Sequence, residues 1–297
     1  MKIALLILLG VFAAGVAVWK FVVAPTPPPL RFETATNGAA PSLAPALAGY
    51  GATLKSHVND QGFVNYQVLQ ANRAQLDAFA ASVGTLDAGV YESWPEAEKI
   101  AFLINAYNAL TLEAILANYP IKPTLAGTLA PKNSIRQIPG VWDKLEFQLL
   151  GKPATLDVIE HQMLRKQFNE PRIHLALVCA SIGCPTLRNE AYEAARLNEQ
   201  LDDQTRKLLA DASKFKLDRQ ARVVHLSSLF KWYGGDFVKR YAAQQPAGHP
   251  TGQSDAERAV LNYFGSLLES ADREWLSKEQ YEIKYLDYDW SLNEQKN

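Results

Sequence analysis

The chain has 297 residues, of which 48% are hydrophobic and 21% are charged, proportions that are ordinary for a globular protein. Its 30 basic and 31 acidic residues give a net charge of −1 and form no long run of one sign, which argues against a nucleic-acid partner. The two cysteines, Cys179 and Cys184, are too few for a disulfide-rich scaffold, and their close spacing indicates either local partners or local chemistry.

The first 24 residues predict where the protein resides. Lys2 and the amino terminus supply positive charge, and Ile3 to Trp19 are 17 apolar residues in a row. As a helix, residues 3–24 would reach about 33 Å, enough to cross a bilayer core of roughly 30 Å. We therefore expect a periplasmic or otherwise extracytoplasmic protein that residues 3–24 anchor in the inner membrane, with a cleaved signal peptide as the alternative.

Composition divides the chain into three parts. Residues 1–24 form the signal peptide or anchor, residues 25–45 form a linker rich in proline and alanine, and residues 46–293 form one globular domain. The linker begins with Pro25-Thr26-Pro27-Pro28-Pro29, which favours a stiff polyproline spacer. We expect contact with the membrane through the N-terminal segment only.

Apolar spacing predicts two helices in the first part of the domain. The first covers residues 67–83, with apolar side chains at Leu69, Leu76, Phe79 and Val83. The second follows Ser93 and Pro95, is apolar on nearly every face over residues 100–117, and ends before Pro120. Its polar residues Asn105, Asn108 and Glu113 would make a membrane span costly, so we expect a buried central helix.

The rest of the domain alternates between short strands and helices. We expect strands at 145–149, 173–179, 222–226 and 281–286, and helices at 155–168, from Pro185, at 198–212, 227–233 and 254–268. Uneven helical blocks between the strands are typical of an α+β fold. The sequence therefore predicts a single α+β domain in which the buried helix packs on a mostly antiparallel sheet.

The two cysteines are the candidate reactive groups. Cys179 ends an expected strand, and Cys184 precedes Pro185 at an expected helix start, where backbone amides would lower the pKa of a thiol. The amides of Ser181 and Gly183 would be available to hold an oxyanion. Inert buried cysteines, a structural disulfide and a functional thiol remain open as alternatives.

His161 is the candidate base for such a thiol. Asp157, His161 and Arg165 follow one another at intervals of four, so they share one helix face. Asp157 would then orient the imidazole of His161, as in a nucleophile–base–orienter set. The alternative is a charge ladder on the surface.

Three polar residues stand in apolar surroundings. A buried amide costs about 1–3 kcal/mol unless it is hydrogen-bonded, so Asn105 and Asn108 either fasten loops to the core or, in one case, orient a catalytic histidine. Glu160 lies beside the apolar stripe of its helix, and a buried carboxylate needs a partner. We expect Arg165 or Arg172 to be that partner.

A zinc site would draw on Cys179, Cys184, His161 and His174. The Cys-x4-Cys spacing lies at the edge of the common ligand spacings, and both histidines precede the cysteines, so we expect no metal and no cofactor. His174 is also the weaker candidate for the base, because alternation along the expected strand turns it away from Cys179.

Four stretches of the sequence resemble the domain-of-unknown-function family 547. They are residues 102–111, 159–165, 172–185 and 226–237, and the closing Tyr288-Asp289-Trp290-Ser291-Leu292-Asn293 is also typical. The resemblance covers about residues 50–293 and implies no settled activity. It favours Cys179 and His161, because the position that matches Cys184 is more often serine in plant-like members and the one that matches His174 varies.

The combination of a buried helix, an antiparallel sheet and a Cys–His pair is similar to papain- and transglutaminase-like folds, which is an analogy of fold only. One departure is clear. Those enzymes carry the cysteine on a helix and the histidine on a strand, whereas here Cys179 is expected on a strand and His161 on a helix.

Two functions from different classes follow. A thiol hydrolase or acyltransferase that acts on peptide or amide bonds would use Cys179 as nucleophile, His161 as base, and Asp157 or Asn105 as orienter. A non-catalytic envelope scaffold or interaction domain would instead carry a structural Cys179–Cys184 disulfide and a partner surface around residues 232–237. The partner is accordingly a peptide substrate or an unknown envelope protein.

Overall fold

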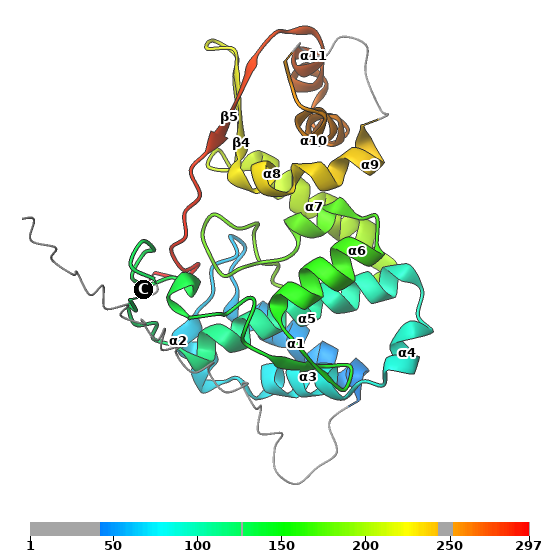
Figure 1. Cartoon of the computed structure of the whole chain (residues 1–297), viewed down its shortest axis with the longest axis vertical. Helices are drawn as coiled ribbons and strands as arrows, with labels where there is room; N and C mark the ends of the chain where they lie inside the picture. The colour runs from blue at the N-terminus through cyan, green and yellow to red at the C-terminus, as the bar shows by residue number, and fades with distance from the viewer. Residues whose placement is uncertain (1–41, 126, 243–251, 297) are drawn as a thin grey trace, which may run out of the picture.

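The computed structural model describes residues 42–125, 127–242 and 252–296, so the expected N-terminal anchor and most of the expected linker lie outside the described residues. The described chain is largely helical with small sheets, which confirms a single α+β domain (Figure 1). The first helix begins at Leu43, within the segment expected to be linker.

The helices and strands follow one another in an irregular order along the chain. The helical segments are α1 (Leu43–His57), α2 (Tyr66–Ala71), α3 (Ala74–Thr85), α4 (Ala88–Glu92), α5 (Glu96–Ala117), η1 (Ile135–Gln137), η2 (Val158–Leu164), α6 (Arg165–Gln167), η3 (Pro171–Leu175), η4 (Ala194–Arg196), α7 (Leu197–Ala210), α8 (Ser228–Tyr233), η5 (Gly234–Phe237), α9 (Val238–Tyr241), α10 (Asp255–Gly265) and α11 (Ser270–Lys278). The strands are β1 (Phe147–Leu149), β2 (Lys152–Ala154), β3 (Phe215–Asp218), β4 (Val223–Ser227) and β5 (Glu282–Leu286).

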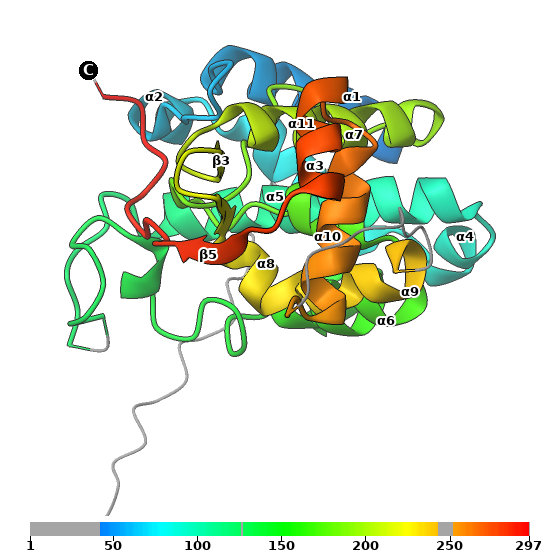
Figure 2. The ribbon, with the colours of Figure 1, turned by 90° about the horizontal axis from the view of Figure 1, so that it is seen from above.

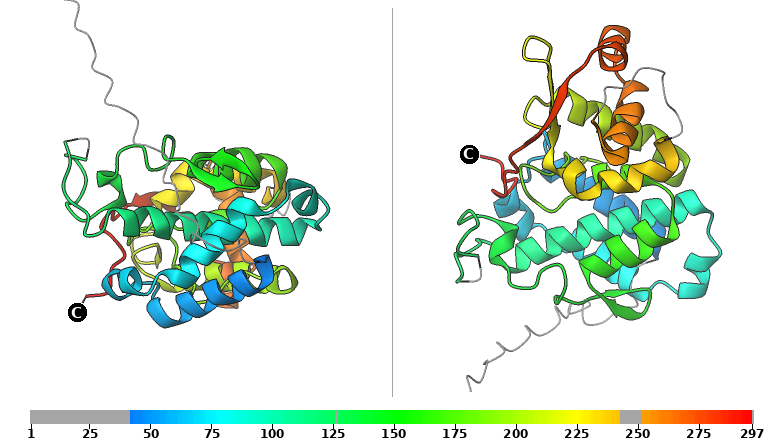
Figure 3. Two further views of the ribbon diagram at one scale, coloured as in Figure 1. Left: turned by 90° about the horizontal axis from the view of Figure 1, so that it is seen from below. Right: turned by 45° about the horizontal axis from the view of Figure 1, so that its top comes forward.

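The central helix is α5, as the sequence predicts. It starts after Pro95, carries Glu96 and Glu98 in its first turn, and buries every residue from Ile100 to Leu116. Its length and composition would suit a membrane span, but 94% of the apolar window is buried inside the fold. Figure 3 shows α5 in the middle of the helical part, and its closest partners are helical segments such as α3 and η2 rather than a sheet.

Two small sheets account for the strands. β1 and β2 form an antiparallel hairpin, and β4 pairs antiparallel with β3 and parallel with β5. Figure 2 shows the second sheet beside α10 and α11. Ser227 ends β4 and caps α8, because its side chain accepts the N–H of Leu229.

The core consists of two apolar clusters. The larger cluster gathers α1, α3, α5 and the segments around η2, in the lower half of Figure 1, and the smaller one gathers α8, α9, α10 and the second sheet above it. Leu175 belongs to the smaller cluster, while its near neighbours Ile173 and Ala176 belong to the larger one. Residues 173–176 therefore lie where the two clusters meet.

Three sequence expectations about local structure are wrong. The expected helix 67–83 is two helices, because α2 ends at Ala71 before α3 begins at Ala74. Residues 173–178 are buried as expected and Cys179 is half-buried, but the segment is not a strand, since the chain forms the 3-10 helix η3 from Pro171 to Leu175 and Glu170 caps it. No helix starts at Pro185, and the next helical turn begins at Ala194.

The C-terminal segment connects the two halves. After β5 it runs back toward α2 (Figure 1), and the N–H groups of Ile182 and Gly183 donate to the carbonyls of Ser291 and Asp289 at 2.9 and 2.8 Å. Asn293 then receives a hydrogen bond from the hydroxyl of Tyr66 at 2.7 Å. The closing motif of the sequence is therefore the strap that holds the cysteine turn.

Candidate functional site

A cavity of about 550 Å³ opens between the two halves of the domain. It is lined by the two cysteines, two histidines, three acidic residues and a set of aromatic and aliphatic side chains: Cys179, Cys184, His161, His174, Asp143, Asp157, Glu160, Tyr107, Trp142, Trp232, Tyr233, Tyr288, Trp290, Leu177 and Leu229. A mostly apolar cavity with a few convergent titratable groups is the usual form of a binding or active site. The expected meeting of Cys179 and His161 in one cleft is thus found in this cavity.

Cys179 and Cys184 are joined by a disulfide in the cavity wall, with their Cα atoms 6.3 Å apart. The N–H of Cys179 also approaches the sulfur of Cys184, at 2.9 Å. Neither sulfur is a thiol in this form, so neither is available as a nucleophile or as a zinc ligand. The zinc set considered from the sequence is excluded in this form, because zinc binds thiolates.

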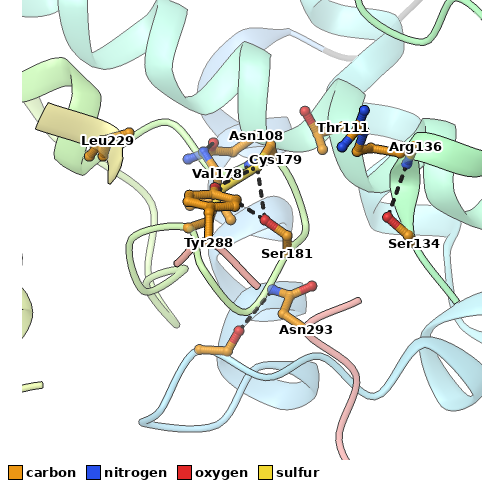
Figure 4. Close-up of a disulfide and its surroundings, with 12 residues drawn as sticks. Asn108, Thr111, Ser134, Arg136, Val178, Cys179, Ser181, Leu229, Tyr288 and Asn293 are labelled. Carbon is orange, nitrogen blue, oxygen red and sulfur yellow. Dashed lines mark hydrogen bonds between the residues drawn. A yellow bond between two sulfur atoms is a disulfide. The ribbon is translucent and has the colours of Figure 1, made fainter. Parts of the chain in front are cut away.

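Two hydroxyl groups surround the sulfur of Cys179 (Figure 4). Oγ of Ser181 lies 3.1 Å from Sγ of Cys179, and the hydroxyl of Tyr288 lies 3.2 Å from the same atom and 3.0 Å from Sγ of Cys184. Burial raises the pKa of Tyr288, which keeps its proton on the oxygen. If the disulfide is reduced, these donors are placed to stabilise a thiolate at Cys179.

The turn between the cysteines is held tightly by the strap. Ala180 has a positive φ of 55°, a conformation that a residue with a side chain adopts at some cost. A Cβ at Gly183 would meet the backbone nitrogen of Asp289 and the ring of Tyr288, each at 2.9 Å. The amide of Gly183 is engaged with Asp289, so the expected oxyanion hole at this amide is not present.

Asp157, His161 and Arg165 lie on one face of their helix, as expected. Nη1 of Arg165 is 3.1 Å from Nδ1 of His161, and Nε2 of His161 is 3.8 Å from Oδ1 of Asp157. Because a guanidinium can only donate, the neutral ring of His161 carries its proton on Nε2. His161 is one-third exposed and reaches the cavity, but Asp157 is not within hydrogen-bond distance of it.

The second histidine has the closer carboxylate. Nε2 of His174 lies 2.7 Å from Oδ2 of Asp236, its ring stacks on Tyr233, and its Nδ1 is 4.0 Å from Oε1 of Glu160. Burial lowers the pKa of His174, and Asp236 opposes this effect without reversing it. His174 is therefore a neutral imidazole with its proton toward Asp236. It faces the same cavity as Cys179, so its expected orientation away from that cysteine is wrong; the reason is that the segment is not a strand.

Glu160 is buried, as expected, but its partners differ from those expected. Hydrogen bonds from Tyr107 and Tyr233 reach its carboxylate, and these bonds, together with burial, raise the pKa of both phenols. Arg165 is bound to Asp236 through two contacts, and Arg172 is bound to Glu170. The sequence identified the buried carboxylate but could not show which groups approach it from other segments.

Asn105 and Asn108 fasten loops to the core, the first of the two roles considered for them. The side chain of Asn105 donates to the carbonyl of Tyr192 and accepts its N–H, both at 2.8 Å. Asn108 makes the same pair of bonds to Ala176 and Val178, both at 2.9 Å. Asn105 does not orient a catalytic histidine, because Tyr192 occupies both ends of its amide.

Cys184 is not at a helix start, which corrects another expectation. Residues 185–193 are irregular, so no row of free helical amides lies beside this sulfur, and a helix dipole cannot lower its pKa. The hydroxyl of Tyr288 donates to this sulfur instead, at 3.0 Å. Within the described ranges, no group of three or more His, Cys, Asp or Glu side chains is arranged to hold a metal ion.

Sequence reasoning did not assign to the site several residues that line the cavity: Tyr107, Trp142, Asp143, Tyr288 and Trp290. It also missed Asp236, which bonds the cavity histidine His174, and it placed Trp232 and Tyr233 only in a possible partner surface. Most of them come from segments far apart in the chain. The one sequence signal for Tyr107, for residues 232–236 and for residues 288–290 is that they lie in the stretches that resemble the family. Aromatic residues in a sequence are more often core than cavity wall, so no local pattern distinguishes them.

Residues 91–209 match a family model described as "Protein of unknown function, DUF547". No curated protein matches the chain, and no solved structure matches it. The matched segment runs from α4 to α7 and contains both cysteines, both cavity histidines and the central helix, whereas the aromatic residues of α8 and of the strap follow it. The match confirms the resemblance and places residues 91–209 in the domain-of-unknown-function family 547.

Proposed function

We propose that this domain is a thiol hydrolase or acyltransferase of the cell envelope, acting on peptide or amide bonds, and that the Cys179–Cys184 disulfide is its inactive form. The observation that supports this function is the single cavity that brings the sulfur of Cys179 together with two imidazoles and several carboxylates. A nucleophile beside a base that a third group orients is the usual arrangement for acyl transfer.

Activation requires a dithiol reductant. It transfers two electrons to the disulfide, becomes a disulfide itself, and leaves a thiol on Cys179 and another on Cys184. The hydroxyls of Ser181 and Tyr288 then stabilise the thiolate of Cys179. An oxidising compartment favours the disulfide, which agrees with the proposed extracytoplasmic location.

In the reaction itself, the sulfur of Cys179 attacks the carbonyl carbon of the substrate, and the proton that leaves the thiol passes through an imidazole to the departing amine. Water, or an acceptor amine in a transferase, then attacks the thioester and restores the thiol. His174 is the better placed imidazole in this form, because Asp236 orients it at 2.7 Å and leaves Nδ1 without a proton. His161 would first have to release Arg165 from its Nδ1.

The thiol of Cys179 provides the test. The Cys184→Ser variant cannot form the disulfide, and we expect its Cys179 to react with iodoacetamide with an apparent pKa below the roughly 8.5 of an ordinary thiol. Cys179→Ser, which keeps only Cys184, is the matched control. An alkylation profile of Cys179 that resembles that of a simple thiol such as glutathione would contradict the proposal.

The same alkylation measurement shows which of the two histidines acts as the base. In the Cys184→Ser background, His174→Ala should slow alkylation at neutral pH more than His161→Ala does, because only His174 has an oriented ring with an available nitrogen. If His161→Ala slows alkylation more than His174→Ala does, His161 is the base and Asp157 orients it, as the sequence pattern suggests.

A non-catalytic interaction domain is the second candidate, and the disulfide itself favours it. In that case the disulfide is structural, and the large exposed side chain of the expected surface is Trp232, which is 46% exposed. The expected partner surface at residues 232–237 is smaller than predicted, because Phe237 is fully buried and Asp236 is paired with Arg165. An unreactive Cys179 in the Cys184→Ser variant would favour this second candidate.

A further inference from the structure

One side of the cavity is an aromatic wall built from three distant segments. The rings of Trp232 and Tyr288 have centroids 4.9 Å apart, and those of Tyr288 and Trp290 are 4.5 Å apart. Trp142 meets Trp290 edge to face at 6.2 Å. Trp232 is the most accessible of these rings, since it is among the exposed large hydrophobic residues. Such a cluster gives a ligand several ring faces at once.

Acidic groups complete the cavity. Asp143, Asp157 and Glu160 line it, and among the described lining residues none is a lysine or an arginine. Two arginines contact lining residues, and both already have partners. Arg165 pairs with Asp236, and Arg136 lies over the outer ring Trp290, 5.0 Å from its centroid. The cavity therefore presents acidic side chains beside aromatic faces, and the groups that contact these acids are histidines and phenols rather than lysines or arginines.

These two features together select the charge of the ligand. The face of an aromatic ring is electronegative and attracts a cation within about 6 Å of its centroid, and carboxylates add a direct ion pair. Two rings near the site already accept an arginine in this way: Trp290 takes Arg136, and Tyr233 takes Arg165 at 5.1 Å. An anionic ligand would meet three carboxylates and no lysine or arginine on the described wall.

We infer that the cavity binds a peptide through a primary ammonium group, such as a lysine-type side chain, held between the aromatic wall and the carboxylates of Asp143 and Asp157. The inference rests on the proposed function only if the bound peptide is also the substrate of the thiol. Binding itself does not need the thiol, so it is measured on the disulfide form, in which Cys179 cannot react.

The cavity supplies its own reporter, because Trp142, Trp232 and Trp290 line it and the whole chain has six tryptophans. Tryptophan fluorescence of the oxidised protein is titrated with Nα-acetyl-lysine methylamide and with its norleucine analogue, which has a hydrogen atom in place of the ammonium group. We expect the lysine probe to bind at least roughly tenfold more tightly and to weaken as salt is added. Equal affinity of the two probes would overturn the inference, and the comparison does not depend on any variant.

Charge-removing variants locate the ammonium group. Asp157→Asn and Asp143→Asn should each reduce the preference for lysine over norleucine by roughly three- to tenfold, because each removes a cavity carboxylate. Glu146→Gln is the matched control: Glu146 is exposed, does not line the cavity, and should leave the preference unchanged. A loss of preference in the control as large as in the cavity variants would also overturn the inference.

A neutral sugar is the other ligand that stacks on aromatic rings. If an N-acetylglucosamine oligomer alters the fluorescence and the lysine probe does not, the cavity recognises sugar rather than an ammonium group. That result would not change the reactivity of Cys179 toward iodoacetamide. Ligand binding therefore tests this inference, and alkylation of Cys179 tests the proposed function separately. An unreactive Cys179 with intact lysine binding would make the domain an ammonium-binding module.

Discussion

The side chain of Asn108, in the middle of the buried helix α5, holds Val178, the residue directly before the disulfide cysteine Cys179. Its Oδ1 accepts the N–H of Val178 at 2.9 Å, and its amide nitrogen donates to the carbonyl of Ala176 at the same distance. A helix side chain thus provides the hydrogen bonds that a neighbouring strand would have provided.

Replacing Asn108 by alanine should therefore lower the free energy of unfolding by about 1–3 kcal/mol, because two buried backbone groups lose their partners. Urea denaturation of the disulfide form measures the change. Asn118→Ala at the end of α5 is the control, since its amide bonds a carbonyl of its own helix in a partly exposed position, and its cost should be smaller. Equal costs would show that the bonds to residues 176–178 contribute little.

Asp236 connects the imidazole of His174 with the guanidinium of Arg165, and its removal should be costly. Burial works against its ionisation, but hydrogen bonds from His174 and Arg165 outweigh burial and lower the pKa of the carboxyl. Asp236→Asn should lower the free energy of unfolding by about 1–3 kcal/mol at neutral pH, since the buried His174 loses a charged partner. The contribution of Asp236 is present above the pKa of the unfolded carboxyl and is lost as the pH falls. The exposed pair Arg219–Asp272 supplies the control, Asp272→Asn, with an expected effect below about 1 kcal/mol.

Glu113 should make stability depend on pH in the opposite direction. Burial outweighs the neighbouring Arg73 and raises the pKa of Glu113 to about 9, while its Oε1 has no hydrogen-bond partner among the described residues. In the unfolded chain this carboxyl has the ordinary pKa of a glutamate, 4.5. Unfolding therefore releases a proton between these two values, and the stability due to Glu113 falls as the pH rises.

Glu113→Gln keeps a neutral side chain of similar shape and should remove this slope. We expect the wild-type protein to lose up to about 1.4 kcal/mol per pH unit relative to the variant between pH 5 and pH 8, measured by urea denaturation at each pH. Parallel curves for the two proteins would mean that Glu113 is ionised beside Arg73 in the folded state.

Export is tested independently of the fold. A fusion of residues 1–45 to alkaline phosphatase should be active, because that reporter needs an oxidising compartment. If residues 3–24 remain as an anchor, the full chain should also sediment with membranes. An inactive phosphatase fusion beside an active cytosolic reporter would contradict the proposed location.

Several elements follow from local sequence alone. The apolar run of α5, the capping serines of α8 and α10, and the alternating residues of β4 and β5 each specify their structure through nearby side chains. The burial of Asn108 and Glu160 is also evident from the sequence, because each interrupts an apolar pattern.

Residues 173–179 show where local reading fails. An apolar run of this length suits a buried strand or another buried segment equally well, and only the tertiary partner decides which one forms. Here Pro171 starts a helical turn, and the side chain of Asn108 accepts a hydrogen bond from the backbone N–H of Val178, just before Cys179. His174 belongs to the same segment. Strand alternation predicts that its side chain points away from Cys179, whereas in the 3-10 helix it lines the same cavity.

The sequence by itself determined the class of fold, the buried central helix, and two cysteines near enough to join, because these depend on composition, periodicity and short spacing. Only the tertiary structure decided which groups share the cavity. Trp232 and Tyr288 join the cysteines in the cavity from segments later in the chain, and Asp236 reaches the cavity histidine His174 in the same way. The strap that carries Tyr288 is held by hydrogen bonds to the turn at residues 180–183. Long-range contacts of this kind leave no local pattern, since each partner satisfies its hydrogen bonds or charge only after the chain has folded.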